Sequence, residues 1–225
     1  MANSDVILNY YDKLAADYDA DRFSNTYGKY IHRQEVKLLT KLLSAAGEKI
    51  IDLGCGTGRL TSFATIGIDG SKEMLAIAQA KFNDKQFICA TIDDIPLADN
   101  SIDTIYSLHV FMHLSNEAAL AGFTEIARIL KPGGKLIFDF PAAKRRKLLG
   151  SGTTGWHGNT AYTIATLKEM LGPAFKLQKS YGILFFPVHR LPKKIRKYFS
   201  GIDELLCHSF LKTYASYNLA VFTKK

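Results

Sequence analysis

The stretch Lys49-Ile-Ile-Asp-Leu-Gly-Cys-Gly-Thr-Gly58 joins a short apolar run to a cluster of glycines. The apolar run predicts a buried strand. The glycines let the chain turn tightly after it and approach a ligand without Cβ clashes. Arg59 stands where the dinucleotide pattern G-x-G-x-x-G needs its third glycine, so the spacing here is G-x-G-x-G. The stretch therefore predicts a ligand site at a strand end and argues against a nicotinamide or flavin cofactor.

A second short strand is predicted at Thr65-Ile-Gly-Ile-Asp69. Its last residue, Asp69, is placed to accept hydrogen bonds from both hydroxyls of a ribose. A plainer reading also stands, in which the glycines form a tight strand-to-helix turn and Asp69 only leads into the next helix.

Strands and helices alternate on both sides of these two strands. Helical periodicity covers residues 6–46, a helix capped by Ser71 runs to Phe82, and another begins at Ser115 or Asn116 and ends before Lys131-Pro-Gly-Gly134. Further strands are predicted at residues 86–90, 104–108, 135–140, 176–186 and 216–222, with a short helix over 166–171. This alternation predicts an α/β fold with a parallel sheet covered on both faces.

Composition fits one globular domain. The chain has 225 residues, of which 47% are hydrophobic and 22% charged, and no apolar stretch approaches the ~20 residues of a membrane span. The N-terminus lacks the features of a secretory signal. Three cysteines at wide spacing fit neither a disulfide framework nor a zinc site, so we expect a reducing, cytoplasmic setting.

Charge is distributed unevenly along the chain. Residues 1–143 hold 14 Lys and Arg against 18 Asp and Glu, whereas residues 144–225 hold 15 against 3. Such an excess favours an anionic partner, namely a phosphate-bearing substrate, a nucleic acid or a lipid surface. A solvated basic face that only aids solubility remains the alternative.

Five motifs in a fixed order make the chain resemble the class I S-adenosylmethionine-dependent methyltransferases, and its opening, Tyr10–Asp19, resembles the leader of the small-molecule branch. The motifs are Ile50-Ile-Asp-Leu-Gly-Cys-Gly-Thr-Gly-Arg-Leu60, Gly67-Ile-Asp-Gly-Ser71 with Met74-Leu75, Asp94-Ile-Pro-Leu-Ala-Asp-Asn-Ser-Ile-Asp103, Ser107-Leu-His with Met112-His-Leu114, and Arg128-Ile-Leu-Lys-Pro-Gly-Gly-Lys-Leu136. The resemblance covers residues 10–140.

The resemblance implies a Rossmann-like, doubly wound sheet of seven strands with the last one antiparallel, and an S-adenosylmethionine cofactor across the strand ends. It divides a single domain into an N-terminal helical cap (1–46), a cofactor-binding core (47–140) and an acceptor-side part (141–225) with a helical, basic insertion at 189–213 before the last strand.

The same resemblance assigns roles to residues. The methionine part of the cofactor would lie among Asp52, Gly54, Cys55, Gly56 and Gly58. Asp69 would hold the ribose, and Gly70, Ser71 and Met74 would line the adenosine. Thr91, Ile92 and Asp93 would meet the adenine, and Ser107, Leu108 and His109 would pass beneath the sulfonium.

Two departures from the family pattern stand out. Relatives have about six more residues than the eleven from Gly58 to Asp69, so the first crossover has room for one or two helical turns or a loop, and one sheet face is expected to be thinly covered there. Thr91 stands where many relatives carry an acid for the adenine, and a hydroxyl accepts without charge assistance.

The methyl donor is already activated, so a protein base is needed only for an acceptor such as a hydroxyl. His109 and His113 follow the fourth strand and are the candidate bases; a packing role is the alternative for each. Their spacing of four also suits a metal, but no third ligand is evident, and we assign no metal. Trp156-His157 is a candidate acceptor wall or a local anchor, and Tyr11, Tyr18 and Tyr27 are candidate lid residues or packing residues.

The sequence thus predicts an S-adenosylmethionine-dependent methyltransferase for a small-molecule acceptor, and the basic segment leaves room for an anionic or lipid-linked one. Lys193-Lys-Ile-Arg-Lys-Tyr-Phe199 predicts either an interfacial helix on anionic lipid, a lid over the acceptor, or a helix packed on the sheet. An RNA-directed methyltransferase, although no RNA-binding module is evident, and a non-catalytic cofactor-binding regulator remain alternatives.

Overall fold

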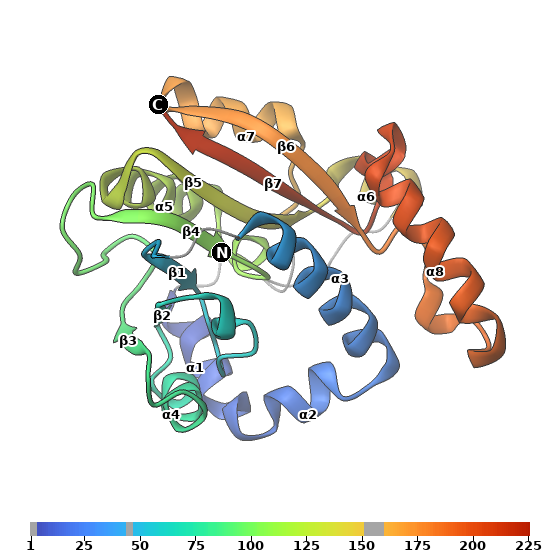
Figure 1. Ribbon diagram of the computed structural model, residues 1–225, viewed down its shortest axis with the longest axis horizontal. Helices are drawn as coiled ribbons and strands as arrows, with labels where there is room; N and C mark the ends of the chain where they lie inside the picture. Colours follow the sequence, from blue (N-terminus) through green and yellow to red (C-terminus); the bar gives the residue numbers. More distant parts are fainter. Residues whose placement is uncertain (1–3, 44–46, 151–159) are drawn as a thin grey trace.

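The computed structural model describes residues 4–43, 47–150 and 160–225, and its centre is one mixed sheet. Seven strands lie in the order β3-β2-β1-β4-β5-β7-β6 (Figure 1). They are β1 (Ile50–Leu53), β2 (Ile66–Asp69), β3 (Gln86–Cys89), β4 (Ile102–Ser107), β5 (Leu130–Pro141), β6 (Phe175–Ile183) and β7 (Tyr217–Lys224). The predicted seven-stranded, doubly wound architecture is confirmed.

The direction of each strand also follows the prediction. Strands β1 to β5 pair in parallel, whereas β7 pairs antiparallel with both β5 and β6. The strand order reverses between β1 and β4, because β2 and β3 lie on one side and β5 on the other. The ends of β1 and β4 therefore form the crevice at which open α/β sheets bind ligands.

One face of the sheet is covered by α5 (Asn116–Ile129) and α7 (Ile164–Leu171). Ser115 caps α5 by accepting a hydrogen bond from the backbone N–H of Ala118, as predicted. Apolar side chains of α5 such as Phe123 and Ile126 pack against β4 and β5 in a continuous core. Burial on this face follows the 3.6-residue period of the α5 sequence.

The other face is covered by α3 (Thr26–Leu42) and α8 (Lys193–His208). The crossover from β1 to β2 contains only a single 3-10 turn, η2 (Thr61–Phe63), as its short length predicts. Leu39 of α3 packs there with Leu60 and Ala64 around the sheet. The expectation of thin cover is therefore wrong, because a helix from the N-terminal segment takes the place of the missing crossover helix.

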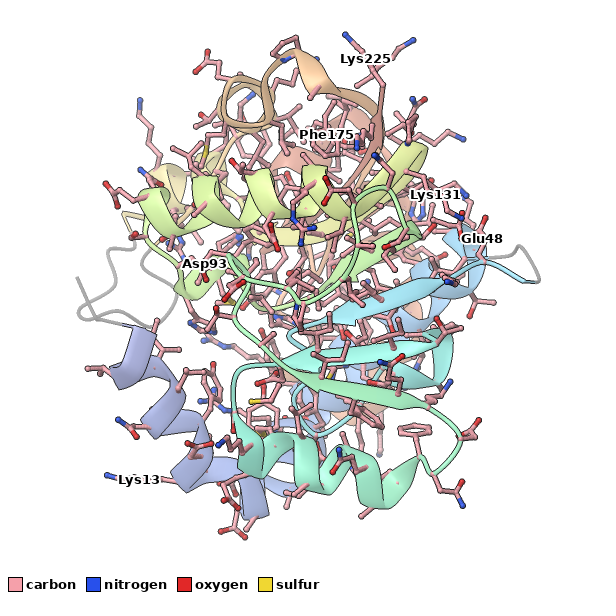
Figure 2. The ribbon with its side chains drawn as sticks, turned by 90° about the vertical axis from the view of Figure 1, so that its left-hand side faces the viewer. Lys13, Glu48, Asp93, Lys131, Phe175 and Lys225 are labelled. Carbon is pink, nitrogen blue, oxygen red and sulfur yellow. The ribbon has the colours of Figure 1, made fainter. Side chains whose placement is uncertain are left out.

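The N-terminal helices lie at the carboxyl ends of the strands. They are α1 (Ser4–Leu14), the 3-10 turn η1 (Ala15–Asp17) and α2 (Tyr18–Phe23), and α1 contacts α4 (Lys72–Lys81). Figure 2 shows Asp93, which follows β3, on the side of α1, whereas Glu48 and Lys131, near the starts of β1 and β5, lie at the opposite side. The described helices of the cap predicted for residues 1–46 thus reach the strand ends.

Some element boundaries differ from the predictions. Strand β5 begins at Leu130, so Lys131-Pro-Gly-Gly134 lies within the strand rather than before it, while α5 still ends at Ile129. Strand β6 ends at Ile183 and is followed by η5 (Val188–Arg190), and η6 (Phe210–Tyr214) leads from α8 to β7. A short helix, α6 (Ala143–Leu149), follows β5. Trp156 and His157 lie outside the described residues.

The lengths and compositions of the helices also bear on whether one of them could cross a membrane. Within the described ranges, no helix combines the length and the apolar character that a membrane-spanning segment requires.

Candidate active site

A cavity of about 180 Å³ lies at the carboxyl ends of β1, β2 and β4, under α1. Its walls come from the glycine loop, the ends of β2 and β3, the segment after β4 and the N-terminal helices. Among the lining residues are Leu8, Tyr11, Tyr18, Gly54, Gly56, Asp69, Gly70, Met74, Thr91, Ile92, Asp93, Leu108, His109 and His113. The cavity therefore brings together most of the predicted site residues.

The glycine loop lines the cavity mainly with backbone atoms, because Gly54 and Gly56 carry no side chain. Gly54 and Gly56 have φ of +74° and +54°, a conformation that strains other residues. A Cβ on Gly54 would lie 2.2 Å from Cγ2 of Val110, whereas a Cβ on Gly56 would meet no protein atom within 4 Å. Gly56 thus keeps open a space that belongs to the cavity, which is what a loop that contacts a ligand through its backbone requires.

Asp69 ties the glycine loop to helix α4. Its Oδ2 accepts a hydrogen bond of 2.7 Å from the backbone N–H of Gly56, and its Oδ1 accepts one of 2.9 Å from that of Ser71. Burial raises the pKa of Asp69, while these backbone donors lower it. Each carboxylate oxygen has a second lone pair, so the side chain can still accept from ligand hydroxyls in the cavity that it lines.

A smaller cavity of about 40 Å³ adjoins the first and shares Tyr18, Gly54, Gly56, Leu108 and His109 with it. Asp52, Cys55 and Arg59 also line it. Burial raises the pKa of Asp52 to about 7, although Thr61 Oγ1 donates to its Oδ2 at 2.7 Å. This polar cavity adjoins the apolar one at the loop, so a ligand with a charged end and a flat apolar end suits the pair.

Three predicted site residues are not among the described residues that line either cavity. A Cβ on Gly58 would crowd Ala78 and Phe82, so this glycine admits α4 close to the loop. Ser71 caps α4 by accepting from the backbone N–H of Met74, and it contacts Asp12 of α1. Ser107 is fully buried in β4. Their positions give them supporting roles around the cavity.

His109 is held between two carboxylates. Its Nε2 lies 2.5 Å from Oε1 of Glu35, and its Nδ1 lies 3.5 Å from Oδ2 of Asp139, whose Oδ1 accepts from the His109 backbone N–H at 2.6 Å. Burial lowers the pKa of His109, but the two carboxylates outweigh it and raise the pKa overall. With φ of +63°, the residue is held in a strained conformation by these contacts.

Arg59 completes this buried cluster. Its Nη1 donates to Oε2 of Glu35 at 2.6 Å and lies 2.9 Å from Nδ1 of His32, and its guanidinium carbon lies 4.0 Å from the ring centroid of Phe23. Burial raises the pKa of Glu35, but His109 and Arg59 bring it down to about 2. The carboxylate therefore stays charged between two cations.

His113 lies in the wall of the larger cavity. Its Nε2 is 3.0 Å from the hydroxyl oxygen of Tyr11 on α1, and the two rings meet edge to face. Burial raises the pKa of Tyr11 above the usual range for tyrosine, so its hydroxyl is neutral. Unlike His109, this histidine pairs with a neutral group that can pass a proton.

The tyrosines proposed as a lid divide into two groups. Tyr11 and Tyr18 line the larger cavity, and their rings contact each other edge to face. Tyr27, in the first turn of α3, instead hydrogen-bonds Tyr217 of β7, and both pack against the core. No group of three metal-binding side chains occurs among the described residues.

Sequence reasoning did not identify Glu35, Arg59 or Asp139 as parts of the site. Glu35 lies in a helix whose apolar residues face the sheet, and it is 0% exposed. A single acid on an apolar helical face is a signal of a buried ion pair, but its partners lie in distant segments that no local pattern indicates.

The geometry fits S-adenosylmethionine, the cofactor that the resemblance implies. The smaller cavity, with Asp52, Arg59 and the glycine loop, suits a charged amino-acid end. Asp69 suits a ribose, and the apolar wall of Met74, Ile92 and Leu108 suits a purine. The clear space over Gly56 is the observation that favours a bound ligand rather than a plain turn.

Comparisons with known proteins agree with this geometry. The profile of a family described as "Methyltransferase domain" matches residues 51–138. A malonyl-[acyl-carrier protein] O-methyltransferase of a Marinomonas species is 32% identical over 146 residues, which are 59% of this chain and 53% of that protein. An uncharacterised protein of Methanocaldococcus jannaschii is 33% identical over 231 residues, covering 94% of this chain and 88% of the relative. The chain thus matches about half the length of the first curated relative, and 40% of the length of an uncharacterised mycobacterial methyltransferase.

Solved structures share the fold. A methyltransferase of Thermotoga maritima, described as a possible histamine N-methyltransferase, superposes with a TM-score of 0.73 at 18% identity, covering 97% of this chain and 99% of that one. The magnesium protoporphyrin IX methyltransferase of Synechocystis, solved with S-adenosylhomocysteine, gives 0.70 at 19% identity over 99% and 100% of the two chains.

Proposed function

The chain belongs to the class I S-adenosylmethionine-dependent methyltransferases, and from that premise we propose that it methylates an oxygen of a small-molecule acceptor bound in the larger cavity. The observation that carries the proposal is the pair of His113 and Tyr11 in the wall of that cavity, within hydrogen-bond distance of each other. A proton acceptor at this place suits a hydroxyl that must lose its proton as it is methylated. The relative of the Marinomonas species also carries the name of an O-methyltransferase.

When bound, S-adenosylmethionine supplies an activated methyl group for in-line displacement. The protein's part is to align the acceptor with that group, which contributes on the order of 7–11 kcal/mol to catalysis. The glycine loop and Asp69 would fix the cofactor, and Leu108 with the segment after β4 would form the surface beneath the reacting atoms. Tyr11 and Tyr18, carried by the N-terminal helices, would exclude water from above.

His113 Nε2 would take the proton of the acceptor hydroxyl, directly or through the hydroxyl of Tyr11. His109 is a poorer base because both its nitrogens face carboxylates, which favour its charged form. We assign His109 to positioning: it fixes Glu35 and Arg59 beside the smaller cavity.

The acceptor is expected to be small because the larger cavity lies under α1, with Ile7, Leu8 and Tyr11 in its wall, and must also hold most of the cofactor. The three cysteines, Cys55, Cys89 and Cys207, are free, which fits a reducing compartment such as the cytoplasm.

Calorimetry with S-adenosylhomocysteine tests the first half of the proposal, with NAD as the control ligand. We expect micromolar binding of the former and none of the latter. Transfer of a labelled methyl group to a panel of small hydroxyl and carboxyl compounds, with matched amines and thiols, tests the second half. Labelling of amines alone would contradict an oxygen acceptor, and absence of S-adenosylhomocysteine binding would contradict the cofactor site.

A further inference from the structure

Helix α8 presents an apolar surface to solvent. Ile195, Tyr198, Ile202 and Leu205 recur at spacings of three and four, which places them along one side of the helix. We call these four residues the α8 surface. All four are exposed, Ile202 by 49% and Leu205 by 70%. Single exposed apolar residues are ordinary on a protein surface, but a row of four along one helix marks an interaction site.

The opposite side of α8 is fixed firmly to the domain. Asp203 is 0% exposed; its Oδ2 accepts from the Tyr30 hydroxyl at 2.9 Å and from Nε2 of Gln34 at 2.8 Å. Its Oδ1 accepts from the backbone N–H of Phe186 at 2.6 Å. Cys207 is buried against Gly182 of β6, where a Cβ would lie 3.1 Å from Cα of Cys207. Helix α8 is therefore firmly held with its polar anchor toward the domain, and the exposure of the α8 surface is a fixed property of the fold.

Charge around the α8 surface is positive. Arg190 and Lys194, at its start, are exposed. Asp203 is buried and accepts the hydrogen bonds that hold α8 to the domain, and Glu204 pairs with Lys37. Glu169 belongs to α7, on the other face of the sheet. These three are the only acids among the last 82 residues, so the described part of α8 turns no unpaired carboxylate toward the α8 surface.

A neighbouring element has the same character. Helix α6 contacts η6, and η6 in turn contacts α8. Helices α6 and α8 lie at the same end of the molecule in Figure 1. Helix α6 carries the basic run Lys144-Arg-Arg-Lys147, and the exposed Leu148 and Leu149 follow that run at the end of the helix. Phe210, in η6, is 87% exposed. Basic residues and exposed apolar residues thus occur together on α6 and on α8, and η6, which contacts both helices, adds an exposed aromatic side chain.

We propose that the α8 surface docks this domain on an anionic lipid membrane. The apolar row would enter the boundary between headgroups and acyl chains, while Arg190 and Lys194 would meet the anionic headgroups. A second copy of the chain is a poorer occupant, since a two-fold contact would bring two basic faces together. No α8 residue is among the described residues that line either cavity, so docking and cofactor binding are separable.

The test is co-sedimentation with phosphatidylcholine vesicles that contain about one third phosphatidylserine, compared with pure phosphatidylcholine vesicles. The wild-type chain should bind the anionic vesicles at low salt and lose binding at high salt. Ile202→Asp/Leu205→Asp should lower the partition coefficient at least tenfold, because two apolar side chains leave the lipid. Arg190→Gln/Lys194→Gln should lower it about fivefold per residue.

Leu120→Asp is the matched control, because Leu120 is an exposed apolar residue on α5, across the sheet from α8. It should bind vesicles as the wild type does, and all variants should bind S-adenosylhomocysteine equally. Equal binding to both kinds of vesicle, or full binding by Ile202→Asp/Leu205→Asp, would overturn the proposal. So would light scattering that shows a dimer converted to a monomer by that double variant, since the surface would then join two copies of the chain.

Discussion

The carboxylate of Glu35, in helix α3, lies 2.5 Å from Nε2 of His109, at the end of β4, although 74 residues separate them in the chain. Arg59 holds the second oxygen of the same carboxylate. This contact joins the helix that covers one sheet face to the strand end at which both cavities meet. Because Glu35 is fully buried, its charge depends entirely on these two partners.

Replacing Glu35 with Gln should destabilise the domain severely. Arg59 would keep its charge in a buried place without the carboxylate that compensates it, and the pKa of His109 would fall, because Glu35 is one of the two carboxylates that raise it. Removing one partner of a buried ion pair typically costs 3–5 kcal/mol. Urea unfolding followed by circular dichroism measures the loss. Glu204→Gln, which removes a carboxylate of an exposed ion pair with Lys37, is the control and should cost at most about 1 kcal/mol. Equal losses in the two variants would contradict the buried role.

Stability should also depend on pH through His109. Its raised pKa means that its contribution is complete below the ordinary value of 6.5 and is lost as pH rises through the raised value. His109→Gln should therefore flatten the fall in unfolding free energy between neutral and alkaline pH. His208→Gln, which removes an exposed histidine of α8, is the control variant. A profile for His109→Gln that still falls like the wild type would show that His109 is not the titrating group.

Asp69→Ala should weaken the binding of S-adenosylhomocysteine roughly 10- to 150-fold, because hydrogen bonds from the ribose to a charged acceptor are lost. Asp103→Ala provides a comparison, since Asp103 also accepts from a backbone N–H, that of Lys49, but lies at the start of β4. Calorimetry should give wild-type affinity for that variant. Unchanged affinity in Asp69→Ala would refute the ribose role.

Gly56→Val should abolish cofactor binding. The valine side chain would meet no protein atom at its Cβ, but it would occupy cavity space that the cofactor needs. The comparison is Gly133→Val, because Gly133 has φ of +79° and its Cβ would likewise meet nothing within 4 Å. Both variants carry similar backbone strain, yet only Gly56 lines the cavity. Thermal melts should shift alike, whereas only Gly56→Val should lose affinity for S-adenosylhomocysteine. Normal binding by a folded Gly56→Val would leave the loop a purely structural role.

His113→Ala should lower kcat by roughly 10²–10⁴ with a hydroxyl acceptor while leaving cofactor affinity nearly unchanged. Tyr11→Phe should lower kcat less if the proton passes directly to His113, and equally if it passes through the tyrosine hydroxyl. His208→Ala, on α8, is the control and should retain wild-type turnover. If His113→Ala turns over normally and His109→Ala does not, the base lies at the earlier histidine.

The cofactor side of the site could be predicted from sequence because its residues follow one another within short motifs. The glycine loop, Asp69 and the cap at Ser71 depend on local turn chemistry and on strand ends, which the chain encodes within a few residues. The seven-stranded, doubly wound sheet followed from the family resemblance, and its last strand, β7, was found antiparallel as expected.

The cluster of Glu35, Arg59 and His109 could not be predicted in the same way. The three residues come from segments far apart in the chain, and their contacts arise only when α3 packs on the sheet. The choice between His109 and His113 was likewise left open, because the two share one short segment and differ only in their partners: carboxylates for the first, a tyrosine hydroxyl for the second.

The short turn η2 has a consequence for how the chain folds. Because α3 supplies the cover that a crossover helix would otherwise provide, residues of the N-terminal segment such as Leu38 and Leu39 complete the apolar cluster that contains Leu60 and Ala64. A fragment that begins at β1 would expose this cluster to water and should not be stable alone. The cap and the cofactor-binding core therefore form a single cooperative folding unit, which should unfold in one transition.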